Sequence, residues 1–163
     1  MDLTPLIEAG PAVQVHVLTV LLAALAGAVA FLRRARDRVH RVAGRVFVVA
    51  MGVSALSSFL ITELALIGPF GPVHLISVWV LWQLWHAVAH IRRGDVAAHG
   101  RAMGDLYFGA IGVAGLFTLF PGRRMSLVLF PDAPVAGFAG VVTLVALVWI
   151  ALARRRRRAR QDA

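Results

Sequence analysis

The chain carries two copies of a basic, histidine-containing stretch, RRARDRVHRVAGR at residues 33–45 and RRGDVAAHGRAMG at residues 92–104. Each copy begins with an arginine pair and has a histidine seven residues after the first arginine. A glycine follows within five residues of that histidine. Because each copy also stands between two long apolar segments, it has the character of a polar connection between two membrane-embedded helices.

A histidine precedes each copy at nearly the same distance. His16 lies 24 residues before His40, and His74 lies 25 residues before His99. An offset of 58 to 59 residues therefore places the first set on the second. This offset predicts a duplicated two-helix unit.

The composition is that of an integral membrane protein. Of the 163 residues, 60% are hydrophobic and only 15% are charged, and the mean hydropathy is +0.79. Unbroken apolar runs of about 20 residues match the length of a helix that crosses the hydrocarbon core.

We expect an all-α integral membrane fold that forms a single domain over residues 1–163. Two parallel two-helix repeats, at about 11–67 and 72–120, would make a four-helix bundle. A fifth transmembrane helix at about 135–153 and a basic tail at 154–163 would follow. The expected transmembrane segments within the repeats are 12–32, 46–67, 73–91 and 102–120. The stretch Met125–Phe130 is too short to span, so we expect it at the interface or capping the bundle.

The arginines predict the orientation. All 17 basic residues are arginines; 15 fall in the stretches 33–45, 92–101 and the tail, and only Arg123 and Arg124 lie on the opposite side. This asymmetry predicts a multi-pass membrane protein with its amino terminus outside and its carboxyl terminus inside. The same distribution argues against a nucleic-acid surface, although the net charge is +9. No basic residue precedes Arg33, so we expect no cleaved signal peptide.

The chain contains no cysteine. Disulfides, thiolate metal sites and covalent haem attachment are therefore excluded. Any cofactor must be held by histidine, methionine, carboxylates or the backbone.

The histidines of the repeat favour a bis-histidine b-type haem site, which needs two neutral imidazoles facing each other from different helices. The expected pairs are His16 with His74 in the outer half of the bundle, and His40 with His99 at its inner edge. Hydrogen bonding between helices and solvation at the interface are the structural alternatives for these histidines. Three arginines near the inner pair would bind haem propionates or face lipid headgroups: Arg41, Arg45 and Arg101.

Two further histidines, His86 and His90, stand at i and i+4 on one face of the same helix. With His40 or His99 they would form a transition-metal site on the cytoplasmic side. Packing at the interface is the alternative. Glu63 and Asp105 are the carboxylates inside expected spans, where each would either serve a proton path or reach water at its helix end.

Two motifs resemble an uncharacterised bacterial membrane-protein family, domain of unknown function 2306. The first is HRVAGRVF at residues 40–47, with His16 upstream and Met51 downstream. The second is HGRAM at residues 99–103, followed by YFG at 107–109, AGLFT at 114–118 and PGR at 121–123. The resemblance implies a small multi-span membrane protein. One histidine per helix, paired between alternate helices, is also similar in architecture to cytochrome b561.

Three functions follow as hypotheses. The first is a membrane-embedded haem b protein that transfers electrons across the membrane, with a quinol or a small reductant at one face. The second is a metal or proton transporter, or an assembly factor for haem or copper, that uses the same histidines. The third is a structural subunit without a cofactor. The sequence leaves open whether the chain is an enzyme and whether it forms a homo-oligomer.

Overall fold

The structure is a computed structural model that describes residues 1–33, 35–61, 68 and 71–161. Every regular element in these ranges is a helix. The chain divides into two compact units, Glu8–Gly115 and Met1–Ile7 together with Leu116–Ala163. We call them the histidine unit and the terminal unit. The single domain expected over residues 1–163 stays a prediction, and the boundary between the units falls close to the expected end of the second repeat.

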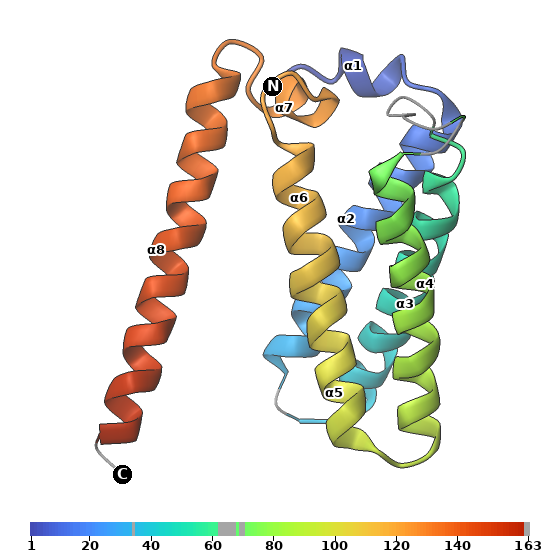
Figure 1. Ribbon diagram of the computed structural model, residues 1–163, viewed down its shortest axis with the longest axis vertical. Coiled ribbons are helices and arrows are strands. Elements are labelled where there is room, and N and C mark those ends of the chain that lie inside the picture. Colours follow the sequence, from blue (N-terminus) through green and yellow to red (C-terminus); the bar gives the residue numbers. More distant parts are fainter. Residues whose placement is uncertain (34, 62–67, 69–70, 162–163) are drawn as a thin grey trace. The chain divides into compact units, whose positions relative to one another are not determined.

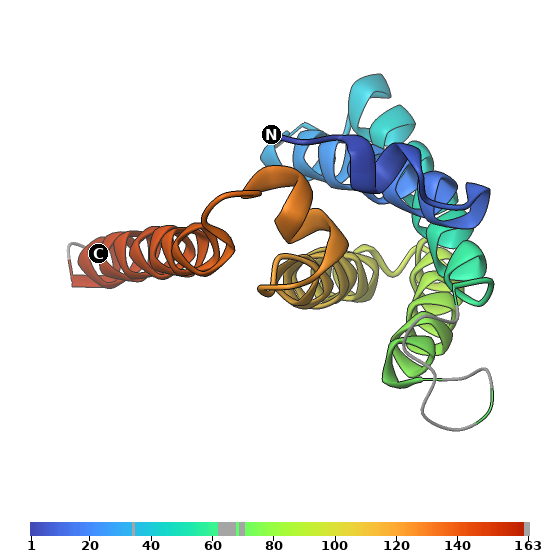
Figure 2. The same ribbon diagram turned by 90° about the horizontal axis from the view of Figure 1, so that it is seen from above.

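Helical stretches that run alternately up and down form the histidine unit (Figure 1). They are α2 (Pro11–Leu32), α3 (Arg38–Ser58), α4 (Pro72–Arg92) and a continuous run of α5 (Val96–Gly104), the π-helix η1 (Asp105–Ile111) and α6 (Gly112–Thr118). The unit boundary falls within α6. Each stretch packs against the next, and η1 contacts both α2 and α4 (Figure 2). This arrangement agrees with the expected order of helices.

Two of these helices begin earlier than the hydropathy of the sequence predicts. The expected segments 46–67 and 102–120 correspond to α3, which starts at Arg38, and to the run that starts at Val96. An aspartate explains each start, because Asp37 accepts a hydrogen bond from the His40 N–H at 3.0 Å and Asp95 accepts one from the Ala98 N–H at 2.9 Å. Such side-chain caps satisfy the free N–H groups of a first turn. His40 and His99 therefore lie inside helices rather than in the connections before them.

Small residues let α2 approach its neighbours. Ala23 and Gly27 are buried beside Phe47, Leu106 and Tyr107 in the core. A Cβ atom placed on Gly27 would lie 2.5 Å from the Tyr107 ring, and the Tyr107 hydroxyl donates a hydrogen bond to the Ala24 carbonyl at 3.2 Å. The packing between α2 and η1 therefore depends on the absence of a side chain at position 27.

The terminal unit contains α1 (Thr4–Ile7), α7 (Arg124–Leu129) and α8 (Pro134–Gln161). Within it α7 is bound to the amino-terminal segment: the Asp2 N–H donates to the Val128 carbonyl at 3.0 Å, and the Arg124 guanidinium donates to the Pro5 carbonyl at 2.9 Å. The stretch expected as a short strip at Met125–Phe130 is thus a short helix covered by α1. The expected fifth helix is α8.

By length and composition, α2 and α3 are the described helices able to cross a membrane, and Pro134–Leu147 is a shorter apolar helix. Crossing by all five expected segments, the parallel relation of the repeats and the orientation stay predictions. Glu63, the end of the first repeat at 62–67, and residues 69 and 70 before α4 lie outside the described residues.

Candidate functional site

The histidine unit has two ends with different chemistry. We call the end that holds the connections α2–α3 and α4–α5 the arginine end, and the end where α2 and α4 begin at Pro11 and Pro72 the proline end. Of the four expected haem ligands, His40 and His99 lie at the arginine end, while His16 and His74 lie at the proline end (Figure 1).

At the arginine end the two histidines are held in the same way. The His40 Nδ1 lies 3.1 Å from the Ala30 carbonyl oxygen on α2, and the His99 Nδ1 lies 2.9 Å from the Ala87 carbonyl oxygen on α4. Each ring therefore bonds back to the last turns of the preceding helix. Within the described residues no hydrogen bond or ring contact joins His40 to His99.

These contacts fix the tautomer of both rings. A carbonyl oxygen only accepts, so Nδ1 carries the proton and donates. In the neutral imidazole, Nε2 then keeps its lone pair. Nε2 is therefore the nitrogen that can coordinate a metal ion. In metal sites, the nitrogen of a histidine that does not bind the metal usually donates a hydrogen bond to a carbonyl or carboxylate, which orients the ring. His40 and His99 are therefore oriented as metal or haem ligands are.

At the proline end His16 makes a related contact across two helices. Its Nδ1 donates to the Ser54 carbonyl on α3 at 2.9 Å, with the Ser54 and Ser57 hydroxyls at 3.3 and 3.4 Å. The half-buried ring is thus held by α3 with the same Nδ1–H tautomer. Its Nε2 has a lone pair for the same reason as at the arginine end.

His74 is held differently. Its Nδ1 accepts a hydrogen bond from the Gly71 N–H at 2.9 Å, and its ring contacts the Phe59 ring at a centroid distance of 5.5 Å. The Gly71 carbonyl oxygen also lies near Nδ1, but at the longer distance of 3.3 Å. An N–H group only donates, so the shorter contact favours the neutral ring with its proton on Nε2. His74 caps the start of its own helix in this structure. To ligate a metal through Nε2 it would have to exchange this tautomer for the other.

A buried serine cluster at the proline end was not identified from the sequence. The Ser58 and Ser77 hydroxyls lie 2.5 Å apart across α3 and α4, and Ser54, Ser57, Ser58 and Ser77 are all buried. The spacing of the three α3 serines at i, i+3 and i+4, which places them on one helix face, was the available signal. These hydroxyls and His16 form a polar layer that joins three helices.

The arginines expected near the inner pair are exposed. Arg41 donates to the Arg36 carbonyl at 3.3 Å, Arg45 lies on the exposed side of α3, and Arg101 lies on α5. In the α2–α3 connection Arg33 pairs with Asp37, and this ion pair, with the His40 N–H, holds the pKa of the Asp37 carboxyl well below its usual range. The pair therefore fixes the connection that leads into His40.

The expected metal pair does not converge on a third ligand. His86 contacts the Trp82 and Trp85 rings, at centroid distances of 4.3 and 4.8 Å, and His90 lies 3.6 Å from the Asp95 carboxylate. Among the described residues, no group of three His, Asp or Glu side chains is placed to hold a metal ion. The transition-metal site at His86 and His90 stays a prediction without a structural partner.

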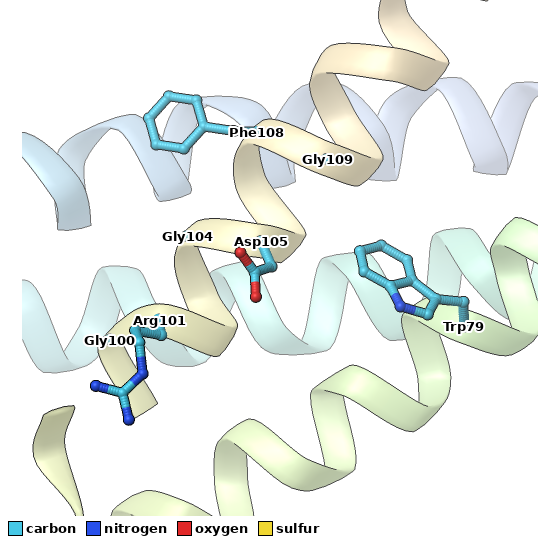
Figure 3. A pocket seen from close by; sticks show the side chains of 7 residues that line it. All are labelled: Trp79, Gly100, Arg101, Gly104, Asp105, Phe108 and Gly109. Atoms are coloured by element: carbon cyan, nitrogen blue, oxygen red, sulfur yellow. The ribbon is translucent and has the colours of Figure 1, made fainter. Parts of the chain in front are cut away.

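An open groove of about 630 Å³ lies between α4 and the α5–η1 run. Trp79 extends from α4 toward the facing run that carries Asp105, and Arg101 stands one turn before Asp105 (Figure 3). Phe108 and three glycines complete the lining: Gly100, Gly104 and Gly109. Asp105, the first residue of η1, is exposed and lines this groove. The proton path expected as one of its two roles stays a prediction.

These features are those of a helical protein with helices long and apolar enough to cross a membrane. A family model described as "Predicted membrane protein (DUF2306)" matches residues 13–154, and the chain belongs to this family. The resemblance seen in the two histidine motifs is thereby confirmed. Comparison with curated proteins and with solved structures gave no match.

Proposed function

We propose that the protein is a multi-pass, membrane-embedded b-type haem protein that transfers electrons across the bacterial inner membrane. The observation that carries this proposal is the matched orientation of His40 and His99, which both donate from Nδ1 to the helix that precedes them. Two hairpins that repeat the same histidine contact favour a shared ligand over two unrelated packing roles.

The residues at the arginine end fit a haem in their chemistry. Two neutral imidazoles from different helices offer Nε2 lone pairs, and Arg41, Arg45 and Arg101 are exposed cations suited to propionates. A haem b held there would supply a one-electron redox centre.

The proline end provides a second pair of possible haem ligands, His16 and His74, but one of them must first change its tautomer. His16 already has the ligating tautomer through Ser54, whereas His74 must release the Gly71 N–H and move its proton from Nε2 to Nδ1. Two sites at opposite ends of the bundle would relay electrons through its length. The five membrane crossings, with the amino terminus outside and the carboxyl terminus inside, belong to this proposal.

The test is an optical spectrum of the detergent-purified protein from cells supplied with haem, oxidised and then reduced with dithionite, together with total metal analysis. We expect a sharp reduced b-type band, lost from the same site in His40→Ala and in His99→Ala. His86→Ala is the matched control, because this histidine contacts tryptophans instead of a carbonyl, and it should keep the full band.

A colourless wild-type protein would overturn the haem proposal. Bound metal in that protein would favour the transporter or assembly factor, and the absence of metal would favour the structural subunit.

A further inference from the structure

The groove between α4 and the α5–η1 run holds two opposite charges that do not pair with each other. Arg101 and Asp105 stand at i and i+4, about 5–6 Å apart at their Cβ atoms in an ideal helix. Both side chains are exposed and line the groove. Nevertheless, neither forms an ion pair or a hydrogen bond with any residue that the structure describes. A charged side chain within a membrane-embedded helix is costly unless something satisfies it.

The remaining lining is flat and apolar. Trp79 presents its indole from α4, and Gly100, Gly104 and Gly109 expose backbone on the facing run. A Cβ atom placed on Gly104 would meet nothing within 4 Å, whereas one on Gly109 would lie 3.3 Å from the Trp79 ring. The groove is therefore open beside Gly104 and narrow at Gly109. A planar ring stacked on the indole fits such a slot better than a branched group.

The charges select among planar or membrane-soluble ligands. A lipid phosphate would pair with Arg101 but would be repelled by Asp105. An acyl chain would leave both charges unsatisfied. A quinol offers a hydroxyl that donates to the carboxylate and, on the opposite side of the same ring, an oxygen that accepts from the guanidinium.

Two further features place this groove beside the redox centre proposed above. Gly100, which lines the groove, directly follows the proposed ligand His99. Asp105 begins the π-helix η1, and π-helical segments recur at functional sites. We propose that the groove binds the head group of a membrane quinone, preferentially as the quinol, with Asp105 and Arg101 on its two oxygens and Trp79 on its face. This inference rests on the proposed electron transfer for the role of the quinone as redox partner. The binding of the quinone itself does not depend on haem.

The experiment measures binding and does not require haem. The purified protein is titrated with decylubiquinol, the favoured form, and in parallel with decylubiquinone. The quenching of tryptophan fluorescence is followed in both titrations, and haem content is determined separately on the same sample. We expect Gly104→Leu to weaken binding at least tenfold, because the new side chain fills the open part of the groove. Gly112→Leu is the matched control; a Cβ there also meets nothing within 4 Å, but Gly112 does not line the groove, so its affinity should stay within twofold of wild type.

A second part of the binding experiment tests the charge at Asp105. An oxidised quinone has only acceptor oxygens, so the carboxylate disfavours it, whereas an amide can donate. Asp105→Asn should therefore bind decylubiquinone severalfold more tightly than wild type. Circular dichroism and size-exclusion elution confirm that each variant is folded.

Equal affinities of Gly104→Leu and Gly112→Leu would overturn the inference, as would wild-type quenching no greater than that of free tryptophan in the same detergent. A Gly104→Leu variant that changes its oligomeric elution and leaves quinone binding intact would also overturn it, and would assign the groove to a neighbouring helix. Quinone binding by a colourless protein would support the groove while refuting the haem proposal.

Discussion

The arginine end and the proline end of the histidine unit belong to the same expected duplication, yet their contacts differ in how well they repeat. At the arginine end both hairpins use an aspartate cap, Asp37 or Asp95, and then a histidine that donates to the preceding helix. At the proline end His16 bonds to α3, whereas His74 bonds to its own helix start. A repeated contact is stronger evidence for a shared role than a repeated residue.

The helix starts explain the difference. Counted from the prolines that begin α2 and α4, His16 is the sixth helical residue and His74 is the third. The sixth residue of α4 is Ser77, which contacts Ser58 on α3, as His16 contacts Ser54 and Ser57. Three residues correspond to about 4.5 Å along a helix. The structural equivalent of His16 is thus Ser77 and not His74. The offset of 58 residues between the two histidines hides this difference of three helical positions.

The largest expected effect comes from removing the histidines of the proline end. His16→Ala and His74→Ala should each abolish the same haem and leave the arginine-end haem intact, because a bis-histidine site fails when either ligand is lost. The measurement is haem per chain together with the reduced spectrum. Ser77→Ala is the control for changes in packing at this end.

Loss of different sites in the two variants would break the duplicated-unit interpretation. Unchanged haem content in both variants would show that the proline end holds no haem. The differing contacts of His16 and His74 would then reflect a real loss of function at the proline end.

A second prediction concerns the packing that positions the arginine end. Gly27→Ala should lower the free energy of unfolding by about 1–3 kcal/mol, because the added methyl group would overlap the Tyr107 ring. Gly44→Ala is the matched control in α3, where a Cβ meets nothing within 4 Å. It should raise the stability by up to about 1 kcal/mol through helix propensity.

Thermal unfolding in detergent measures both changes. A Gly27→Ala variant as stable as Gly44→Ala would mean that α2 and η1 do not approach as closely as the structure indicates.

The polar layer of the proline end gives a third, smaller effect. Ser58→Ala and Ser77→Ala should each cost about 1 kcal/mol, the net value of one hydrogen bond. The double variant should cost less than the sum, since both single changes remove the same contact. Additive costs in a double-mutant cycle would show that the two hydroxyls act independently.

Much of the fold follows from the sequence, because apolar runs and breakers act locally. The start of α2 at Pro11 and the bounds of α4 match the expected segments closely. The starts of α3 and α5 were predicted too late in the sequence. Caps at Asp37 and Asp95 extend these helices into polar sequence, where hydropathy does not indicate a helix. The close contact at Gly27 depends on Tyr107, 80 residues further along the chain, which no local pattern identifies.

The candidate site was predicted less completely, since tautomers depend on neighbours that the sequence does not identify. Nothing in the spacing of His16 and His74 shows that one donates to a carbonyl and the other accepts from an N–H. The opposed charges of Arg101 and Asp105 were visible as residues, but their common groove with Trp79 appears only in the packed helices.

The smallest expected effect lies in the connection that leads into the arginine end. The pKa of the Asp37 carboxyl is lowered in the folded state by Arg33 and by the His40 N–H, so ionised Asp37 favours folding. Its contribution is fully present above the unfolded pKa of aspartate, about 3.9, and disappears as the pH falls through the lower folded value. Asp37→Asn retains a capping oxygen but loses the charge.

Because both side chains of the pair are partly exposed to solvent, wild type and Asp37→Asn should differ by roughly 1 °C or less in Tm at pH 7. This difference should shrink in unfolding scans as the pH is lowered below about 4. A large difference that persists in acid would contradict this account, because both side chains keep a capping oxygen and differ only in charge. A small difference that disappears in acid would leave helix capping as the contact common to both hairpins, since Asp95 caps the Ala98 N–H in the same way.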